Sequence, residues 1–247
     1  MHIPSSADSR KDHERAHGKF LAPRALEIWG WSTPAGKERA RRRTELIIEH
    51  ARIRHCKNVL EYGCGTGMFS LFFAETGITL TAIDISPDLI NEAQKELHAN
   101  IFFQVGDVES LAFPDESFDA VIGNSVLHHV NIEQALVEAF RVLKPGRSIA
   151  FAEPNMMNPQ IALQKNIPSL KRKMGDSPDE TAFFRWQVVN FLQRSGFKDI
   201  MVQPFDFLHP SIPQKMISTV KRLGEFIESV PLIKEFAGSL ILSGRKP

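Results

Sequence analysis

The sequence predicts an α/β fold, in which helices cover both faces of a doubly wound, mostly parallel sheet. Short apolar runs alternate with helical segments between residues 58 and 153, and a glycine-rich segment directly follows the first run. Such alternation is typical of parallel strands joined by right-handed helical crossovers. Hydrophobic residues make up 43% and charged residues 24% of the 247 residues, which is the balance of a globular chain with a substantial core.

The first strong helix signal precedes the sheet. Thr33 and Pro34 form an N-cap followed by proline at the first helical position, which predicts a helix that runs through about Ile53. The predicted inner face of this helix carries Leu46, Ile47, His50 and Ile53. Residues 1–32 are predicted to form an N-terminal extension or lid, of which we expect the first dozen residues to fray.

The apolar runs are rich in β-branched or aromatic residues, which favours strands buried on both faces. They lie at 58–62, 80–84, 101–105, 119–123 and 148–153. Helices are predicted between them at 68–75, at 87–98 behind a Ser-Pro start signal, and at 132–142 before a Lys-Pro-Gly stop.

After Glu153 the alternation lapses. A helix is predicted within 181–196 and strands at 197–205 and 238–244, all within one domain that spans 33–247. Residues 154–180 and 207–236 are predicted to be lid insertions, because long insertions in a compact domain are usually functional. The second insertion carries a helical stripe that we expect to roof the core, with peripheral contact with a membrane as the alternative; the stripe consists of Met216, Val220, Leu223 and Ile227.

Charge and cysteine content narrow the function classes. The net charge is +1, which disfavours generic nucleic-acid binding, and the basic runs at 39–43 and 171–173 are interpreted as charge on the outer faces of helices. Two cysteines and an N-terminal segment without an apolar stretch predict a cytoplasmic protein. We expect neither a transmembrane helix nor a metal site, because no long apolar run and no recognisable ligand spacing occur.

A nucleotide-binding loop is predicted immediately after the first strand. The segment Glu61-Tyr62-Gly63-Cys64-Gly65-Thr66-Gly67 places glycines at alternate positions, which allows a tight turn and close approach of a ligand to the backbone. Its third glycine comes one residue earlier than in the dinucleotide fingerprint, so a pyrophosphate dinucleotide is disfavoured.

Two carboxylates follow at the ends of the next two strands. Asp84 lies 21 residues beyond Gly63, where a carboxylate can accept hydrogen bonds from both ribose hydroxyls. Gly106, Asp107 and Val108 follow the third strand, where a carboxylate can accept from an exocyclic adenine amine and a backbone N–H can donate to a ring nitrogen.

With these motifs in order, the sequence resembles the class I S-adenosylmethionine-dependent methyltransferases, in the branch that includes the quinone-biosynthesis methyltransferases. The resemblance covers VLEYGCGTG, AIDISPDLI, GDVESLAFPDESFDAVIGNSVLHHV and LKPGR, or about residues 57–153. It implies a Rossmann-like, seven-stranded sheet whose last strand, GSLILSG, is antiparallel. It also implies S-adenosylmethionine as cofactor, bound by Glu61, Tyr62, Gly63, Gly65, Gly67, Asp84, Ile85, Gly106, Asp107, Val108, Asn124 and Ser125.

Methyl transfer needs alignment, exclusion of water and, for some acceptors, a base. The candidate bases are His128 and His129 after the fourth strand, although in this family such a segment often shapes the cofactor floor. His209, oriented by Asp206, is a third candidate base from the late insertion. No Asn/Asp-Pro-Pro-Tyr/Phe motif of planar-nitrogen methylation follows the fourth strand, where GNSV stands instead.

The leading hypothesis is therefore a methyltransferase that acts on a small or lipid-like molecule by in-line transfer. The runner-up is the same fold acting on RNA or protein through the basic insertions. A third hypothesis is a cofactor-binding regulatory subunit without catalysis.

Overall fold

The sheet has the predicted architecture. The structure, a computed structural model, describes residues 6–96 and 98–247, and its strands follow the order β3-β2-β1-β4-β5-β7-β6. β7 is antiparallel to both of its neighbours, and the other pairings are parallel, which confirms the prediction for the last strand. The strands are β1 (Asn58–Tyr62), β2 (Thr79–Asp84), β3 (Ile101–Val105), β4 (Phe118–Asn124), β5 (Leu143–Pro154), β6 (Lys198–Phe205) and β7 (Ser239–Arg245).

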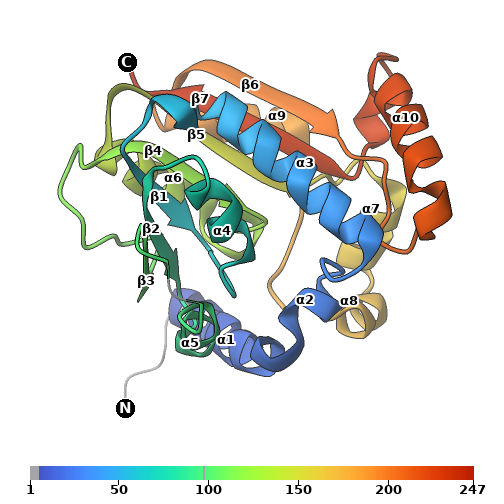
Figure 1. Ribbon diagram of the computed structural model, residues 1–247, viewed down its shortest axis with the longest axis horizontal. Coiled ribbons are helices and arrows are strands. Elements are labelled where there is room, and N and C mark those ends of the chain that lie inside the picture. Colours follow the sequence, from blue (N-terminus) through green and yellow to red (C-terminus); the bar gives the residue numbers. More distant parts are fainter. Residues whose placement is uncertain (1–5, 97) are drawn as a thin grey trace.

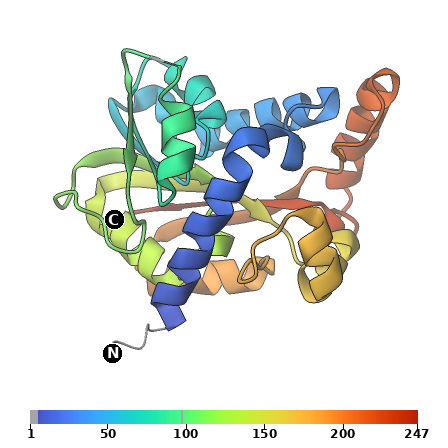
Figure 2. The same cartoon turned by 90° about the horizontal axis from the view of Figure 1, so that it is seen from below.

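Helices form a layer on each side of the sheet (Figures 1 and 2). One layer contains α3 (Pro34–His50), α4 (Met68–Ala74) and α5 (Pro87–Ala93), and the other contains α6 (Ile132–Val142) and α9 (Arg185–Arg194). The predicted N-caps are present, since the Thr33 side chain accepts from the Gly36 N–H and Ser86 accepts from the Leu89 N–H. α5 is shorter than the predicted 87–98, a range that includes the undescribed residue 97.

Two apolar side chains of β3 are exposed, contrary to the expectation that this strand is buried on both faces. Phe102 is 56% and Val105 is 53% exposed. The reason is position, because β3 is an edge strand of the sheet and, within residues 6–96 and 98–247, pairs with β2 alone. An apolar run alone does not distinguish an edge strand from a central one.

The N-terminal segment forms a helix that the sequence analysis did not predict. α1 (Ser6–Leu21) leads through a short 3₁₀ turn, η1 (Ala22–Arg24), into α2 (Ala25–Ile28). Figure 2 shows α1 crossing one edge of the sheet from the α5 side to the α6 side. The expected fraying of the first dozen residues is wrong for Arg10 and Lys11, which form ion pairs with Glu109 and Asp107.

The two insertions are helical. The first contains α7 (Pro159–Asn166) and α8 (Pro168–Met174), and the second contains η4 (Gln214–Met216), α10 (Ile217–Glu228) and η5 (Lys234–Phe236). The remaining 3₁₀ turns are η2 (Ile53–His55) and η3 (Leu127–His129). The expectation that the α10 stripe roofs the core is only half right, because Val220 and Ile227 are partly buried but Met216 and Leu223 are exposed.

Within the described residues, no helix combines the length and the hydropathy that a bilayer crossing requires.

Asp119 ties the beginnings of β1 and β4 together. Its Oδ2 accepts from the backbone N–H groups of Lys57 and Asn58 at 2.8 and 3.0 Å, and its Oδ1 accepts from Lys144 Nζ at 3.0 Å. Burial acts to raise the pKa of Asp119, but these hydrogen bonds outweigh it and lower the pKa to about 2.

We expect Asp119→Asn to lower the free energy of unfolding by about 2 kcal/mol near neutral pH, because charge-assisted hydrogen bonds are lost. A depressed folded-state pKa stabilises the protein above the unfolded value, so the difference between variant and wild type should shrink as pH falls from about 4 towards 2. Urea unfolding of both proteins at several pH values measures this difference in the free energy of unfolding. Asp115→Asn, whose side chain is 75% exposed, is the control, and equal losses in both variants would contradict the role of Asp119.

Candidate functional site

A cavity of about 690 Å³ lies at the sheet edge where β1, β2 and β4 end. Residues of α1 and α2 and of both insertions complete its wall. Of the residues predicted from the sequence, the structure brings the following to this cavity: Gly63, Gly65, Asp84, Ile85, Gly106, Asp107, Val108, Asn124, Ser125, His128, His129 and His209.

Three predicted cofactor residues lie behind the cavity and do not line it. Glu61 is buried and accepts from Ser70 Oγ, and burial raises its pKa to about 8, so its carboxyl group is neutral at pH 7. Tyr62 packs in the core. Gly67 caps α4 with φ +81°, and a Cβ there would lie 2.8 Å from the Phe103 ring. The cofactor roles of Glu61, Tyr62 and Gly67 stay predictions, because these residues lie behind the cavity wall.

The glycine loop and Asp84 form one hydrogen-bonded unit. Gly63 and Gly65 have φ values of +61° and +54°, a region that glycine adopts without steric cost. The Gly65 N–H donates to Asp84 Oδ2 and the Ser86 N–H donates to Oδ1, both at 2.9 Å. Burial raises the pKa of Asp84, and these two hydrogen bonds oppose the rise. The carboxylate is therefore held in one orientation at the cavity wall.

Helix α1 is attached to the next carboxylate along the sheet edge. Asp107 Oδ2 accepts from Lys11 Nζ at 2.6 Å, and Oδ1 accepts from the Glu109 N–H at 2.9 Å. Arg10 pairs with Glu109. Sequence reasoning missed these cations because the residues they contact are about a hundred positions away.

Arg43 is a buried cation that sequence reasoning misplaced. It is 4% exposed, and its Nη1 donates to Asn124 Oδ1 at 3.0 Å while Nη2 donates to Ser239 Oγ. Its guanidinium lies over the Trp31 and Phe205 rings, 5.5 Å from each centroid. Burial lowers the pKa of Arg43 to about 10, so it stays charged at neutral pH.

The interpretation of 39–43 as outer-face charge is therefore wrong for several of its arginines. Arg39 donates to Asp206 at 2.8 Å and Arg42 donates to Glu228, also at 2.8 Å. One signal in the sequence could have revealed Arg43, because it lies four residues before Ile47 and thus on the predicted inner face of the helix. Arg43 lines the cavity and lies 3.6 Å from Asp206, and its buried Nε has no hydrogen-bond partner among the described residues.

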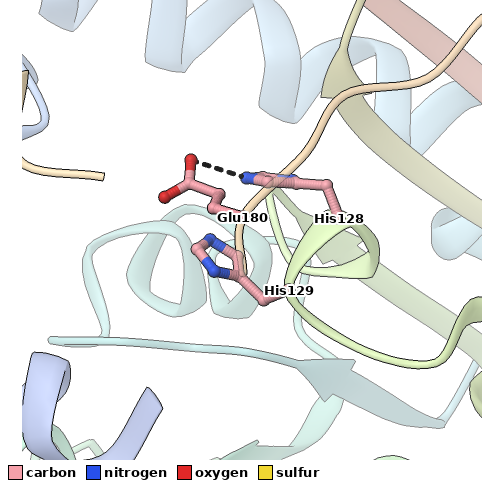
Figure 3. A group of neighbouring side chains, drawn as sticks. All are labelled: His128, His129 and Glu180. Carbon is pink, nitrogen blue, oxygen red and sulfur yellow. Dashed lines mark ion pairs between the residues drawn. The ribbon is translucent and has the colours of Figure 1, made fainter. Parts of the chain in front are cut away.

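His128 has a fixed orientation. Its Nδ1 lies 2.6 Å from Glu153 Oε2, while Glu153 Oε1 accepts from the N–H groups of Val126 and Leu127. The carboxylate at Nδ1 favours a proton on that nitrogen, and a second carboxylate faces the other ring nitrogen, so both ring nitrogens of His128 have an acceptor beside them. Nε2 lies 3.3 Å from Glu180 Oε1, as Figure 3 shows.

His129 and Glu180 complete a charged cluster beside His128 (Figure 3). His129 Nδ1 lies 3.1 Å from Glu14 of α1. Burial acts to lower the pKa of His129, but Glu180 and Glu14 outweigh it and raise the pKa to about 9. For Glu180, burial acts to raise the pKa, but His129, His128 and Lys165 hold it well below its usual range. His129 is therefore an imidazolium at neutral pH and cannot accept a proton.

The ligand atoms of His128, His129 and Glu180 lie within 4.8 Å of one another, a spacing that a metal ion could bridge. The Lys165 ammonium, however, is bonded to Glu180 Oε1, the oxygen that faces His128. Lys165 thus already supplies the positive charge beside this carboxylate, and we do not assign the cluster as a metal site.

His209 lines the cavity without the expected partner. Its Nδ1 accepts from the Ser211 N–H at 3.2 Å, and its Nε2 lies 3.1 Å from Gln160 Nε2. Asp206 binds Arg39 and accepts from the Leu208 N–H instead. The predicted arrangement of Asp206 as the orienting group of a His209 base is therefore wrong.

Comparison with known proteins adds to this geometry. Residues 60–151 match the family model described as "Methyltransferase domain". The chain is 36% identical over 109 residues to the malonyl-[acyl-carrier protein] O-methyltransferase of Erwinia billingiae, a match that covers 44% of this chain and 43% of that protein. It is 33% identical over 150 residues to the demethylmenaquinone methyltransferase of Renibacterium salmoninarum, covering 60% and 62%. The chain thus spans under half the length of the first of these relatives.

Among solved structures, a Thermotoga maritima protein described as an S-adenosylmethionine-dependent methyltransferase, possibly acting on histamine, superposes with a TM-score of 0.65. The match covers 94% of this chain and 100% of that one at 19% identity, so it supports the fold alone.

The charge on His129 predicts a pH dependence of stability. A folded-state pKa raised from 6.5 to about 9 stabilises the protein fully below pH 6.5, and this stabilisation is lost as pH rises through 9. We expect the free energy of unfolding to fall between pH 7 and 10 in wild type, and to fall less in His129→Gln. Urea unfolding at stepped pH measures the slopes. His98→Gln, outside the cluster, is the control, and identical slopes in wild type and His129→Gln would contradict an imidazolium at position 129.

Proposed function

The chain belongs to the class I S-adenosylmethionine-dependent methyltransferases, and we propose that it transfers a methyl group from S-adenosylmethionine to a small or lipid-like acceptor in the 690 Å³ cavity. The single observation that supports this proposal is that the proposed cofactor-binding residues and the proposed base line the same cavity. Glycine loop, Asp84 and Asp107 line one part of it, and His128 lines another.

The described residues fit the cofactor group by group. Gly63 and Gly65 line the cavity in left-handed conformations, with the side chains of Val126 and Trp29 packed against them, and Asp84 presents a fixed carboxylate for ribose hydroxyls. Asp107 is placed for the adenine amine, sharing its Oδ2 with Lys11. Arg43 supplies the donor that a methionine carboxylate needs. Ile85, Gly106, Val108, Asn124 and Ser125 would complete the contacts.

The cofactor, when bound, supplies an electrophilic methyl group on a sulfonium, and the protein has to align an acceptor with it. We propose His128 as the general base, because Glu153 fixes its ring at Nδ1 and, in the neutral form with the proton on Nδ1, Nε2 would take the proton of the acceptor and share it with Glu180. His129 would assist electrostatically, as an imidazolium next to the acceptor. Helix α1, within the proposed 1–32 lid, and the insertions 154–180 and 207–236 would exclude water.

A small or lipid-like acceptor is supported by the cavity and by the relatives. Apolar side chains such as Leu26, Met174 and Phe207 share the wall with the polar cluster, as sites for small organic ligands require. The relatives are named for malonyl-[acyl-carrier protein] and demethylmenaquinone. The basic run on α3 does not support an RNA acceptor, because its Arg39, Arg42 and Arg43 are occupied by internal partners.

Two variants test the methionine end and the adenine end of the proposed cofactor site independently. Arg43→Gln should weaken S-adenosylhomocysteine about tenfold, since a hydrogen bond between charged groups is lost, but leave 5′-methylthioadenosine, which has no methionine carboxylate, unchanged. Asp107→Ala should weaken both ligands. Calorimetry measures the affinities, and Asp88→Asn on α5 is the control. Equal weakening of both ligands by Arg43→Gln, at an unchanged melting temperature, would contradict its assignment to the carboxylate.

The proposed role of His128 as general base is tested by measuring the transfer of label from S-adenosylmethionine, labelled in its methyl group, to a cell extract that contains small metabolites and lipids. We expect His128→Asn to reduce label transfer about a hundredfold, the usual contribution of a general base, while cofactor affinity stays unchanged. Glu153→Gln should shift the pH profile of transfer, because the orienting carboxylate is gone. If wild type binds the cofactor but transfers no label to any fraction, the non-catalytic hypothesis holds instead. Full transfer by His128→Asn would remove the base role.

A further inference from the structure

The two insertions place exposed apolar side chains at one end of the molecule. We call this surface the insertion face, and its apolar members are Ile167, Met174, Leu223, Phe226, Leu232 and Ile233. Phe226 is 67% and Leu232 is 83% exposed. α7, α8 and α10 occupy the same end of the molecule in both views (Figures 1 and 2). Large apolar groups gathered in this way mark an interaction surface.

Helix α10 has one partly buried side and also carries exposed apolar side chains. One side carries Ile217, Val220 and Ile227, which are partly buried against the rest of the protein. Arg42 and Lys221 hold this orientation through ion pairs between α3 and α10. Leu223 and Phe226 lie beside this partly buried side and remain 56% and 67% exposed.

In the part of the chain that the structure describes, the insertions have more unpaired basic side chains than unpaired acidic ones. Each of their acids except Glu225 has an ion-pair partner within the described chain, as in the pairs of Arg42 with Glu228 and Arg185 with Glu235. By contrast, six of their lysine and arginine side chains form no ion pair among the described residues, namely Lys171, which donates to the Pro178 carbonyl, and Arg172, Lys173, Lys215, Arg222 and Lys234. A surface with exposed apolar groups and unpaired cations complements an anionic amphiphilic surface.

The insertion face is continuous with the cavity. Met174 is 47% exposed at the end of α8 and also lines the cavity wall. Residues 207–211, which lead from β6 towards α10, line the same wall. A molecule entering from this end would reach the wall without crossing the rest of the protein.

We propose that the insertion face binds the surface of an anionic lipid bilayer, with the outer side of α10 and the turn at 230–236 inserted at the boundary between headgroups and acyl chains. Arg172, Lys173 and Arg222 then lie at the level of the phosphates. Binding of this kind delivers a lipid-like acceptor to the cavity, a consequence that rests on the proposed function, whereas bilayer binding itself does not.

Sedimentation with vesicles tests the surface. We expect the full chain to bind vesicles of phosphatidylcholine with phosphatidylglycerol, and Leu223→Glu/Phe226→Glu to weaken this partition about a hundredfold, since two apolar side chains no longer leave water. Both sites are exposed, so the melting temperature should be unchanged. Val137→Glu on α6, where the side chain is 55% exposed outside the insertion face, is the matched control and should bind as wild type does.

A second pair of variants tests the charge. Arg172→Gln/Arg222→Gln should weaken partition to the anionic vesicles about tenfold, and added salt should weaken wild type similarly. The control Lys95→Gln/Lys198→Gln removes two cations elsewhere and should have no effect. Partition that is equal on pure phosphatidylcholine and insensitive to these variants would overturn the anionic preference.

Other occupants give distinct results. If wild type binds no vesicle, the proposal fails; a dimer in solution that Leu223→Glu/Phe226→Glu dissociates would then assign the face to a second copy of the chain. Cofactor affinity is measured on the same samples. Vesicle failure with intact cofactor binding overturns this inference alone, and vesicle binding without cofactor binding overturns the proposed function alone.

Discussion

The reversal of strand order between β1 and β4 is the constraint on which the cavity depends. β1 is followed by α4 on one face of the sheet, and β4 leads through η3 to α6 on the other. The two connections therefore diverge, and a crevice opens between them at the ends of these strands. The glycine loop and Asp84 lie on one side of it, and His128 lies on the other. Both ends of the proposed reaction thus arise from one topological feature.

Buried charges then give the crevice its definite shape. Glu153 is fully buried, and it holds His128 and the start of η3 through one side chain. Arg43 links α3 to the end of β4 and to the beginning of β7. An unpaired charge in such places would be costly, so each of these groups restricts where its neighbours can lie. This is a reason for the polar cavity wall to be well ordered before any ligand arrives.

The segments that cover the crevice, α1 and the insertions, differ from the sheet in how they are held in place. α1 is attached mainly by ion pairs at its surface, such as Lys11 to Asp107 and His13 to Asp179, and little of it enters the core. The His13–Asp179 pair is exposed, and pairs of this kind contribute little stability each. The sheet and its flanking layers are thus a rigid base, and the N-terminal segment and insertions are the part in which acceptor specificity can vary without disturbing the fold.

The sequence by itself determined the sheet and the order of the nucleotide-binding groups, because these depend on local signals. Periodicity, caps and glycine spacing act over a few residues, so the strands, the N-caps of α3 and α5, and the position of Asp84 followed from them. Only the tertiary structure decided which charges face inward. Arg43 and Glu153 depend on contacts between distant segments, and helix α1 depends on carboxylates about a hundred residues away. Pairing between side chains that are far apart in the sequence produces no periodic pattern along the chain. A charged residue can be buried wherever the fold supplies its partner.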